Sequence, residues 1–214
     1  MDLKQCGRTG LYLSALGIGT LTWGRDTDGP EALDMLRRFV DAGGNLVECS
    51  ASHGDGMAVD ILSEAISAVG RHRVAVAWRG GVRRASEGAW VSAAGRGDLL
   101  RSLDDALARL DTDYVDVWMV EPRPEVPLEE TLEAATAAYR SGRAHYVGLS
   151  RATHWQLAEA VTRGMLGAGA PISVVEFPFS LADTSRAATV AELSEHGVGV
   201  IAASALAGGA LTGK

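Results

Sequence analysis

Short apolar segments alternate with amphipathic segments along almost the whole chain. The apolar segments are rich in β-branched and aliphatic residues throughout, which is typical of strands that are covered on both faces. The segments between them place apolar residues at helical spacing, and several end at glycine, as helices often do. The predicted strands are Ala15–Thr20, Asn45–Cys49, Arg73–Trp78, Tyr114–Val120, His145–Leu149, Ile172–Phe177 and Val198–Ala203. The predicted helices are Pro30–Ala42, Met57–Val69, Asp98–Leu110, Leu128–Arg140, His154–Thr162 and Ser185–Glu195.

This alternation predicts an α/β fold with parallel strands and right-handed crossover connections. Two architectures fit the pattern, a (β/α)₈ barrel and an open doubly wound sheet. No G-x-G-x-x-G motif follows the first strand, which weakens the case for a dinucleotide-binding open sheet. The segments Leu3–Cys6 and Leu11–Ser14 flank a Gly-Arg-Thr-Gly sequence and predict a hairpin. A hairpin across the bottom of the molecule favours the barrel.

A closed barrel of this kind needs eight strands, and the pattern supplies seven. An arc of seven strands leaves two edges without a partner, which is unfavourable for a sheet. The last residues, ALAGGALTGK, form a glycine-rich segment that predicts no closing helix. We therefore expect one barrel domain over residues 1–214 that is incomplete at its C-terminus, with a gap between its first and last strands.

Composition and charge narrow the range of partners. The 214 residues include 20 Lys+Arg and 27 Asp+Glu, which gives a net charge of −7 and argues against nucleic acid or an anionic membrane as a partner. The chain has no apolar stretch of about 18 residues and no apolar signal core at its N-terminus, so we expect a cytoplasmic protein. Cys6 and Cys49 lack the spacing of metal ligands, and no metal site is predicted.

Polar residues stand where several predicted strands end, at the face that carries the active site of a (β/α)₈ barrel. Three of them, Glu48, Glu121 and Glu176, stand at the ends of apolar strands. Partial burial there would force each carboxylate to find a partner or to raise its pKa. Arg79 is the natural counter-charge. The complete set of polar candidates at these ends is Glu48, Arg79, Glu121, Ser150, Arg151, Glu176 and Ser204, with His53 in the loop after Glu48.

Six segments resemble motifs of the aldo-keto reductase family, in the same order along the chain. They are KQCGRTGLYLSALGIGTLTWG (4–24), DAGGNLVECSASHG (41–54), LDTDYVDVWMVEPRP (110–124), SGRAHYVGLS (141–150), SVVEFPFSLAD (173–183) and ASALAGGALTGK (203–214). The resemblance covers the whole length and implies a (β/α)₈ barrel that binds NADP(H) without a Rossmann motif and acts on a small molecule. It implies cofactor contacts from Thr20, Trp23, Ser150, Arg151, Glu176 and Ser204.

The resemblance also locates the catalytic positions, and all four are substituted. The family's Asp, Tyr, Lys and His fall on Glu48, His53, Arg79 and Glu121, respectively. The family's stacking Tyr falls on Ala203.

Three functions remain open. The first is a retuned site for NADP(H)-linked reduction of a C=O or C=C bond, with His53 as proton donor. The second is a cofactor-independent acid–base enzyme for elimination, isomerisation or cyclisation. The third is a binding or regulatory subunit. The two catalytic interpretations require Glu48, His53, Arg79 and Glu121 to converge at one mouth of the barrel.

Overall fold

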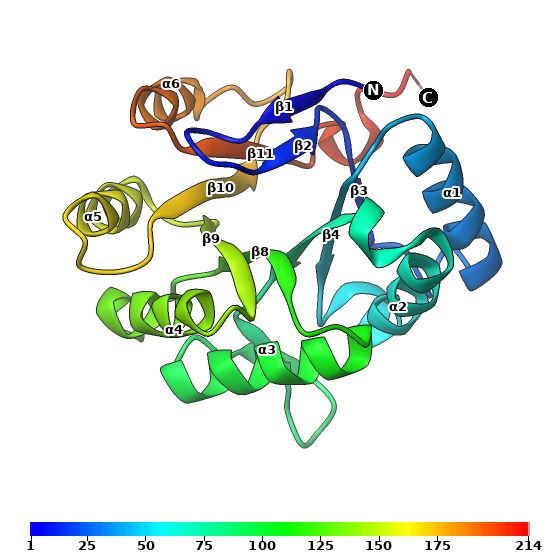
Figure 1. The fold of residues 1–214 in the computed structure, drawn as a ribbon, viewed down its shortest axis with the longest axis horizontal. Coiled ribbons are helices and arrows are strands. Elements are labelled where there is room, and N and C mark those ends of the chain that lie inside the picture. Colours follow the sequence, from blue (N-terminus) through cyan, green and yellow to red (C-terminus); the bar gives the residue numbers. More distant parts are fainter. Residues whose placement is uncertain (214) are drawn as a thin grey trace.

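The computed structural model of the chain describes residues 1–213. Its centre is a curled sheet of seven parallel strands in the order β11-β10-β9-β8-β5-β4-β3 (Figure 1). The strands are β3 (Gly17–Gly19), β4 (Leu46–Ser50), β5 (Ala75–Arg79), β8 (Val115–Val120), β9 (Ala144–Ser150), β10 (Ile172–Pro178) and β11 (Gly199–Ala203). The α-helices lie around the outside of this sheet (Figure 1). They are α1 (Gly29–Asp41), α2 (Ala58–Val69), α3 (Arg96–Leu110), α4 (Leu128–Arg140), α5 (His154–Met165) and α6 (Ala187–Glu195).

The predicted fold class and the order of the elements are confirmed. Each predicted strand and helix is present, although the first strand, β3, has only three residues and α3 begins two residues earlier than predicted. Within residues 1–213, β3 pairs only with β4, and β11 pairs only with β10. The two outermost strands of the sheet therefore do not pair with each other.

The predicted N-terminal hairpin is also present. It consists of β1 (Leu3–Gln5) and β2 (Tyr12–Ser14), which pair antiparallel. Its buried residues Cys6, Leu11 and Leu13 belong to the same apolar cluster as Val117 and Met119 of the sheet. The hairpin thus covers apolar surface inside the curl of the sheet.

A second hairpin was not predicted. It consists of β6 (Val82–Arg84) and β7 (Trp90–Ser92) and lies in the connection between β5 and α3. Each strand has three residues and two of the six are arginine, so the segment carries no apolar run that could have marked it as a sheet.

The sheet separates two apolar clusters, because successive side chains of a strand point to opposite faces. On β5, Ala77 belongs to the inner cluster, and its neighbour Trp78 belongs to the outer cluster between sheet and helices. The alternation continues at the carboxyl ends of the strands. It assigns Glu48 to the same face as Leu46 of the inner cluster, and Arg79 to the face of Ala77. The charged side chains of Glu48 and Arg79 therefore lie on the inner face of the sheet, next to the end of the inner apolar cluster.

Capping side chains fix the starts of two helices. Asp28 accepts a hydrogen bond from the backbone N–H of Glu31 at the start of α1, where Pro30 also follows. Thr153 and Gln156 form a reciprocal capping box at the start of α5. None of the helices described in residues 1–213 is long and apolar enough to cross a bilayer.

Candidate active site at the carboxyl ends of the strands

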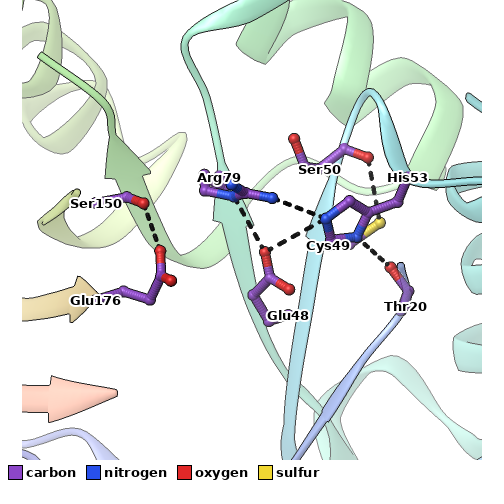
Figure 2. A network of polar contacts seen from close by, with 8 residues as sticks. All are labelled: Thr20, Glu48, Cys49, Ser50, His53, Arg79, Ser150 and Glu176. Atoms are coloured by element: carbon purple, nitrogen blue, oxygen red, sulfur yellow. Dashed lines mark hydrogen bonds and ion pairs between the residues drawn. The ribbon is translucent and has the colours of Figure 1, made fainter. Parts of the chain in front are cut away.

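Glu48, His53 and Arg79 converge in a single polar network at the carboxyl ends of β4 and β5 (Figure 2). The Nη2 of Arg79 lies 2.8 Å from the Nε2 of His53, and the Nε of Arg79 lies 3.4 Å from the Oε1 of Glu48. The Nε2 of His53 lies 3.9 Å from the same carboxylate oxygen. The structure therefore brings together three of the four residues that align with the family's catalytic positions.

A tight turn at residues 53–56 places the His53 ring. Gly54 in this turn has a φ of +55°, and a Cβ atom there would lie 1.7 Å from the backbone oxygen of Trp23. Only glycine fits such a position. The turn carries His53 inward, where its side chain is 2% exposed.

The two ring nitrogens of His53 have different partners. Burial, together with the positive charges of Arg79 and Arg151, lowers the pKa of His53 to about 4, so the ring is neutral at pH 7. A guanidinium can only donate, so Nε2 accepts from Arg79 and the ring proton sits on Nδ1. That proton is donated to Thr20 Oγ1 at 3.0 Å. The ring thus has no free proton for a substrate, contrary to the role expected from sequence.

Glu48 is the group in this network that can exchange a proton near neutral pH. Burial raises its pKa to about 7 against the lowering effect of Arg79, and the negative charge of Glu176 adds to the rise. Its Oε1 is buried without a hydrogen-bond partner, and the Nε of Arg79 is unpartnered in the same way. The two atoms are at ion-pair distance but not in hydrogen-bond geometry, and both are closed to solvent. The Glu48 side chain as a whole is 21% exposed, so a bound molecule can reach other parts of it.

Ser150 and Glu176 form a second buried pair at the ends of β9 and β10 (Figure 2). The Ser150 hydroxyl donates a short hydrogen bond to the Glu176 carboxylate. Arg151 follows, and its backbone N–H donates to the Glu176 carbonyl at 2.9 Å. Arg151 and Ser204 are exposed and have φ values of +52° and +53°, a region that non-glycine residues rarely adopt. Both therefore stand on strained backbone at the same end of the sheet.

Two further predicted site residues make other contacts. Glu121 is buried, and its ion pair, at 3.1 Å, is with Arg123 rather than with the Glu48 network. That Glu121 acts together with this network stays a prediction. Glu121 directly follows β8, which pairs in parallel with β5, so it stands at the same end of the sheet. Trp23 is 1% exposed and packs in the outer apolar cluster, so its ring does not form an open wall. Among residues 1–213, no three His, Cys, Asp or Glu side chains gather as metal ligands.

Residues 15–214 match the sequence profile of the Aldo/keto reductase family. The chain belongs to this family. Among curated aldo/keto reductase relatives, it is 27% identical to the aldo-keto reductase YhdN of Bacillus subtilis. It is 30% identical to a probable voltage-gated potassium channel subunit beta of Oryza sativa subsp. japonica. Both alignments cover all of this chain but only 65% and 66% of the relatives, so the chain spans just under two thirds of their length.

Solved structures of aldo-keto reductases have the same fold. A thermostable aldo-keto reductase solved with the inhibitor epalrestat superposes with a TM-score of 0.79 at 28% identity, over 94% of this chain and 72% of that one. An aldo-keto reductase of Bacillus halodurans in its holo form gives a TM-score of 0.86 at 24% identity, over 98% and 68% of the two chains. The second likeness concerns the fold alone.

The hydrogen bond from His53 to Thr20 predicts the effect of a nearly isosteric change. Thr20→Val leaves a buried N–H without an acceptor, so we expect it to lower the free energy of unfolding by about 1–3 kcal/mol. Urea unfolding measures this loss. Thr184→Val, at an exposed position, is the matched control and should change the free energy by less than about 0.5 kcal/mol. Equal effects of the two variants would contradict the assigned hydrogen bond.

Proposed function

We propose that the mouth of this barrel transfers a proton to or from a small carbonyl compound, with Glu48 as the general acid–base and Arg79 as the group that holds the oxygen. The observation that carries the proposal is the partly exposed Glu48 carboxyl group, one oxygen of which lies 3.4 Å from the Arg79 guanidinium without a hydrogen bond to it. A carboxyl group with a pKa of about 7 is close to the optimum for proton transfer at neutral pH.

The proton step uses both groups. The Glu48 carboxylate removes a proton from the carbon next to the carbonyl, and the electron pair of that C–H bond forms a C=C bond. The carbonyl oxygen becomes negatively charged, and the largely buried Arg79 guanidinium stabilises this charge. Protonated Glu48 then returns the proton to another carbon or to a leaving group. These steps are sufficient for an isomerisation, an elimination or a cyclisation.

His53 has a positioning role in this scheme. It accepts a hydrogen bond from one end of the Arg79 guanidinium, and Thr20 holds the other side of the ring. Because the ring is neutral, it orients Arg79 without competing with Glu48 for protons. The Thr20–His53–Arg79 chain thus aims the guanidinium at the position of the substrate oxygen.

NADP(H)-linked reduction is the second candidate function. Family membership and the exposed guanidinium of Arg151, which can attract a phosphate, favour it. The residues that align with the nicotinamide contacts, however, do not fit that ring. Ala203 offers no aromatic face, and the Ser150 hydroxyl is already bonded to Glu176. Calorimetric titration with NADPH decides between the two candidates.

The titration of Glu48 tests the proposal without a known substrate. In protein labelled with ¹³C at the glutamate carboxyl, we expect one resonance with a midpoint near pH 7 that is missing in the Glu48→Gln variant. A midpoint near the ordinary value of about 4.3 for a free carboxyl would remove the acid–base role. If Glu48 titrates normally and NADPH does not bind, the remaining interpretation is a binding or regulatory subunit.

A further inference from the structure

A cavity of about 440 Å³ lies between the β6–β7 hairpin and helices α2 and α3. It is separate from the Glu48 network, because Trp78, which lines it, belongs to the outer apolar cluster, whereas Glu48 and Arg79 project on the inner face of the sheet. Its volume lies within the range of cavities that enclose small molecules. Its lining does not include Glu48, Arg79, His53 or Thr20, the residues of the proposed proton transfer.

The floor of the cavity is apolar and partly aromatic. Trp90, Ala51 and Val82 line it together with Trp78 and Val59, of which Trp78 is 1% exposed and packed in the outer cluster. Trp90 is half-buried, and the guanidinium of Arg84 lies 5.0 Å from the centre of its ring. Flat aromatic surfaces of this kind favour a planar apolar ligand.

The rim of the cavity is predominantly basic. Four arginines and two aspartates line it. Arg84 and Arg109 are held by Asp55 and Asp60, which stand outside the lining. The remaining lining aspartate, Asp105, is exposed on α3.

Arg83 and Arg101 share one carboxylate, that of Asp98. Arg101 is 2.6 Å from its Oδ1, whereas Arg83 is 3.9 Å from the same atom. The half-exposed Arg83 side chain is thus the least engaged cation of the rim. A ligand anion can approach it without breaking a close ion pair, and a guanidinium binds a carboxylate, sulfonate or phosphate through two parallel hydrogen bonds.

The cavity also adjoins the turn that carries His53. Arg84 and the indole N–H of Trp90 both donate to the Asp55 carboxylate, and Arg109 donates to the Gly56 carbonyl at 2.6 Å. Residues 55 and 56 complete the turn that begins at His53. Three lining side chains therefore hold this turn in place.

We propose that this cavity is a second ligand site, which binds a planar aromatic anion with its ring on Trp90 and its charge on Arg83. The site lies on the outer side of the sheet, and ligand binding there does not require the reaction proposed at Glu48.

Calorimetry with 1-naphthalenesulfonate as the probe tests this site. We expect binding of one molecule per chain with a dissociation constant on the order of 1 mM or tighter, and binding of uncharged 1-naphthalenemethanol at least about tenfold weaker. Arg83→Ala should weaken sulfonate binding by about tenfold or more, because it removes the charge-assisted hydrogen bonds. Ser102→Leu, on the cavity wall, should also weaken it by filling space.

Two matched arginine variants locate the probe. Arg37→Ala, on the exposed surface of α1, and Arg151→Ala, at the barrel mouth, should leave the affinity unchanged. Thermal melts confirm that each variant is folded. Absence of binding, equal affinity for the alcohol, or an affinity that depends on Arg151 instead of Arg83 would each overturn the proposal.

Discussion

Glu48→Gln is expected to slow the proposed proton transfer by about 10²- to 10⁴-fold, the usual contribution of a general acid–base. Glutamine keeps the size of the side chain but cannot exchange the proton. The measurement is exchange of deuterium from D₂O into the carbon next to the carbonyl, followed by ¹H NMR over a panel of small carbonyl compounds. This readout requires neither a cofactor nor an identified product.

The pH dependence of this exchange shows whether Glu48 acts as a base or as an acid. The basic form of Glu48 abstracts the proton, so the rate should rise with pH through a midpoint near 7 and then level off. Glu64→Gln, at an exposed position on α2, is the control and should keep the wild-type rate. A Glu48→Gln variant that exchanges at the wild-type rate, with the same pH profile, would rule out Glu48 as the base.

Trp118→Ala is expected to lower the free energy of unfolding by about 3–5 kcal/mol, the largest stability effect among the substitutions considered. Trp118 lies at the centre of β8, is fully buried and belongs to the outer cluster between sheet and helices. The substitution removes the ring from between packed neighbours and leaves a cavity that the surrounding strands and helices only partly fill. Urea unfolding followed by far-UV circular dichroism measures the change.

Trp155→Ala is the matched control for this substitution. Trp155 is 77% exposed on α5, so its removal should change the free energy of unfolding by no more than about 0.5 kcal/mol. The same residue type is thereby removed from a core and from a surface. A similar loss in both variants would show that the outer cluster does not carry the stability of the fold.

The alternation of apolar and amphipathic segments was sufficient to predict the sheet and its helices. Period and length distinguish strand from helix, and short connections between parallel strands force the crossovers. The same logic placed Glu48, Arg79, Ser150 and Glu176 at one end of the sheet, because the carboxyl ends of parallel strands share one edge. The β6–β7 hairpin was not predicted because its strands have only three residues each, and the two arginines of β6 interrupt any apolar run.

By itself, the sequence determined which ionisable residues stand at the barrel mouth, and the tertiary structure decided what each can do there. Glu48 and His53 have ordinary pKa values in an unfolded chain. Burial moves the two pKa values in opposite directions, to about 7 and about 4, because it disfavours the charged form of each group. The partner of the Arg79 side chain and the His53 nitrogen that Thr20 contacts both depend on the exact course of the loops, to within the length of a hydrogen bond. The pattern of residue types along the chain does not specify the loops to that precision, so only the tertiary structure decides these contacts.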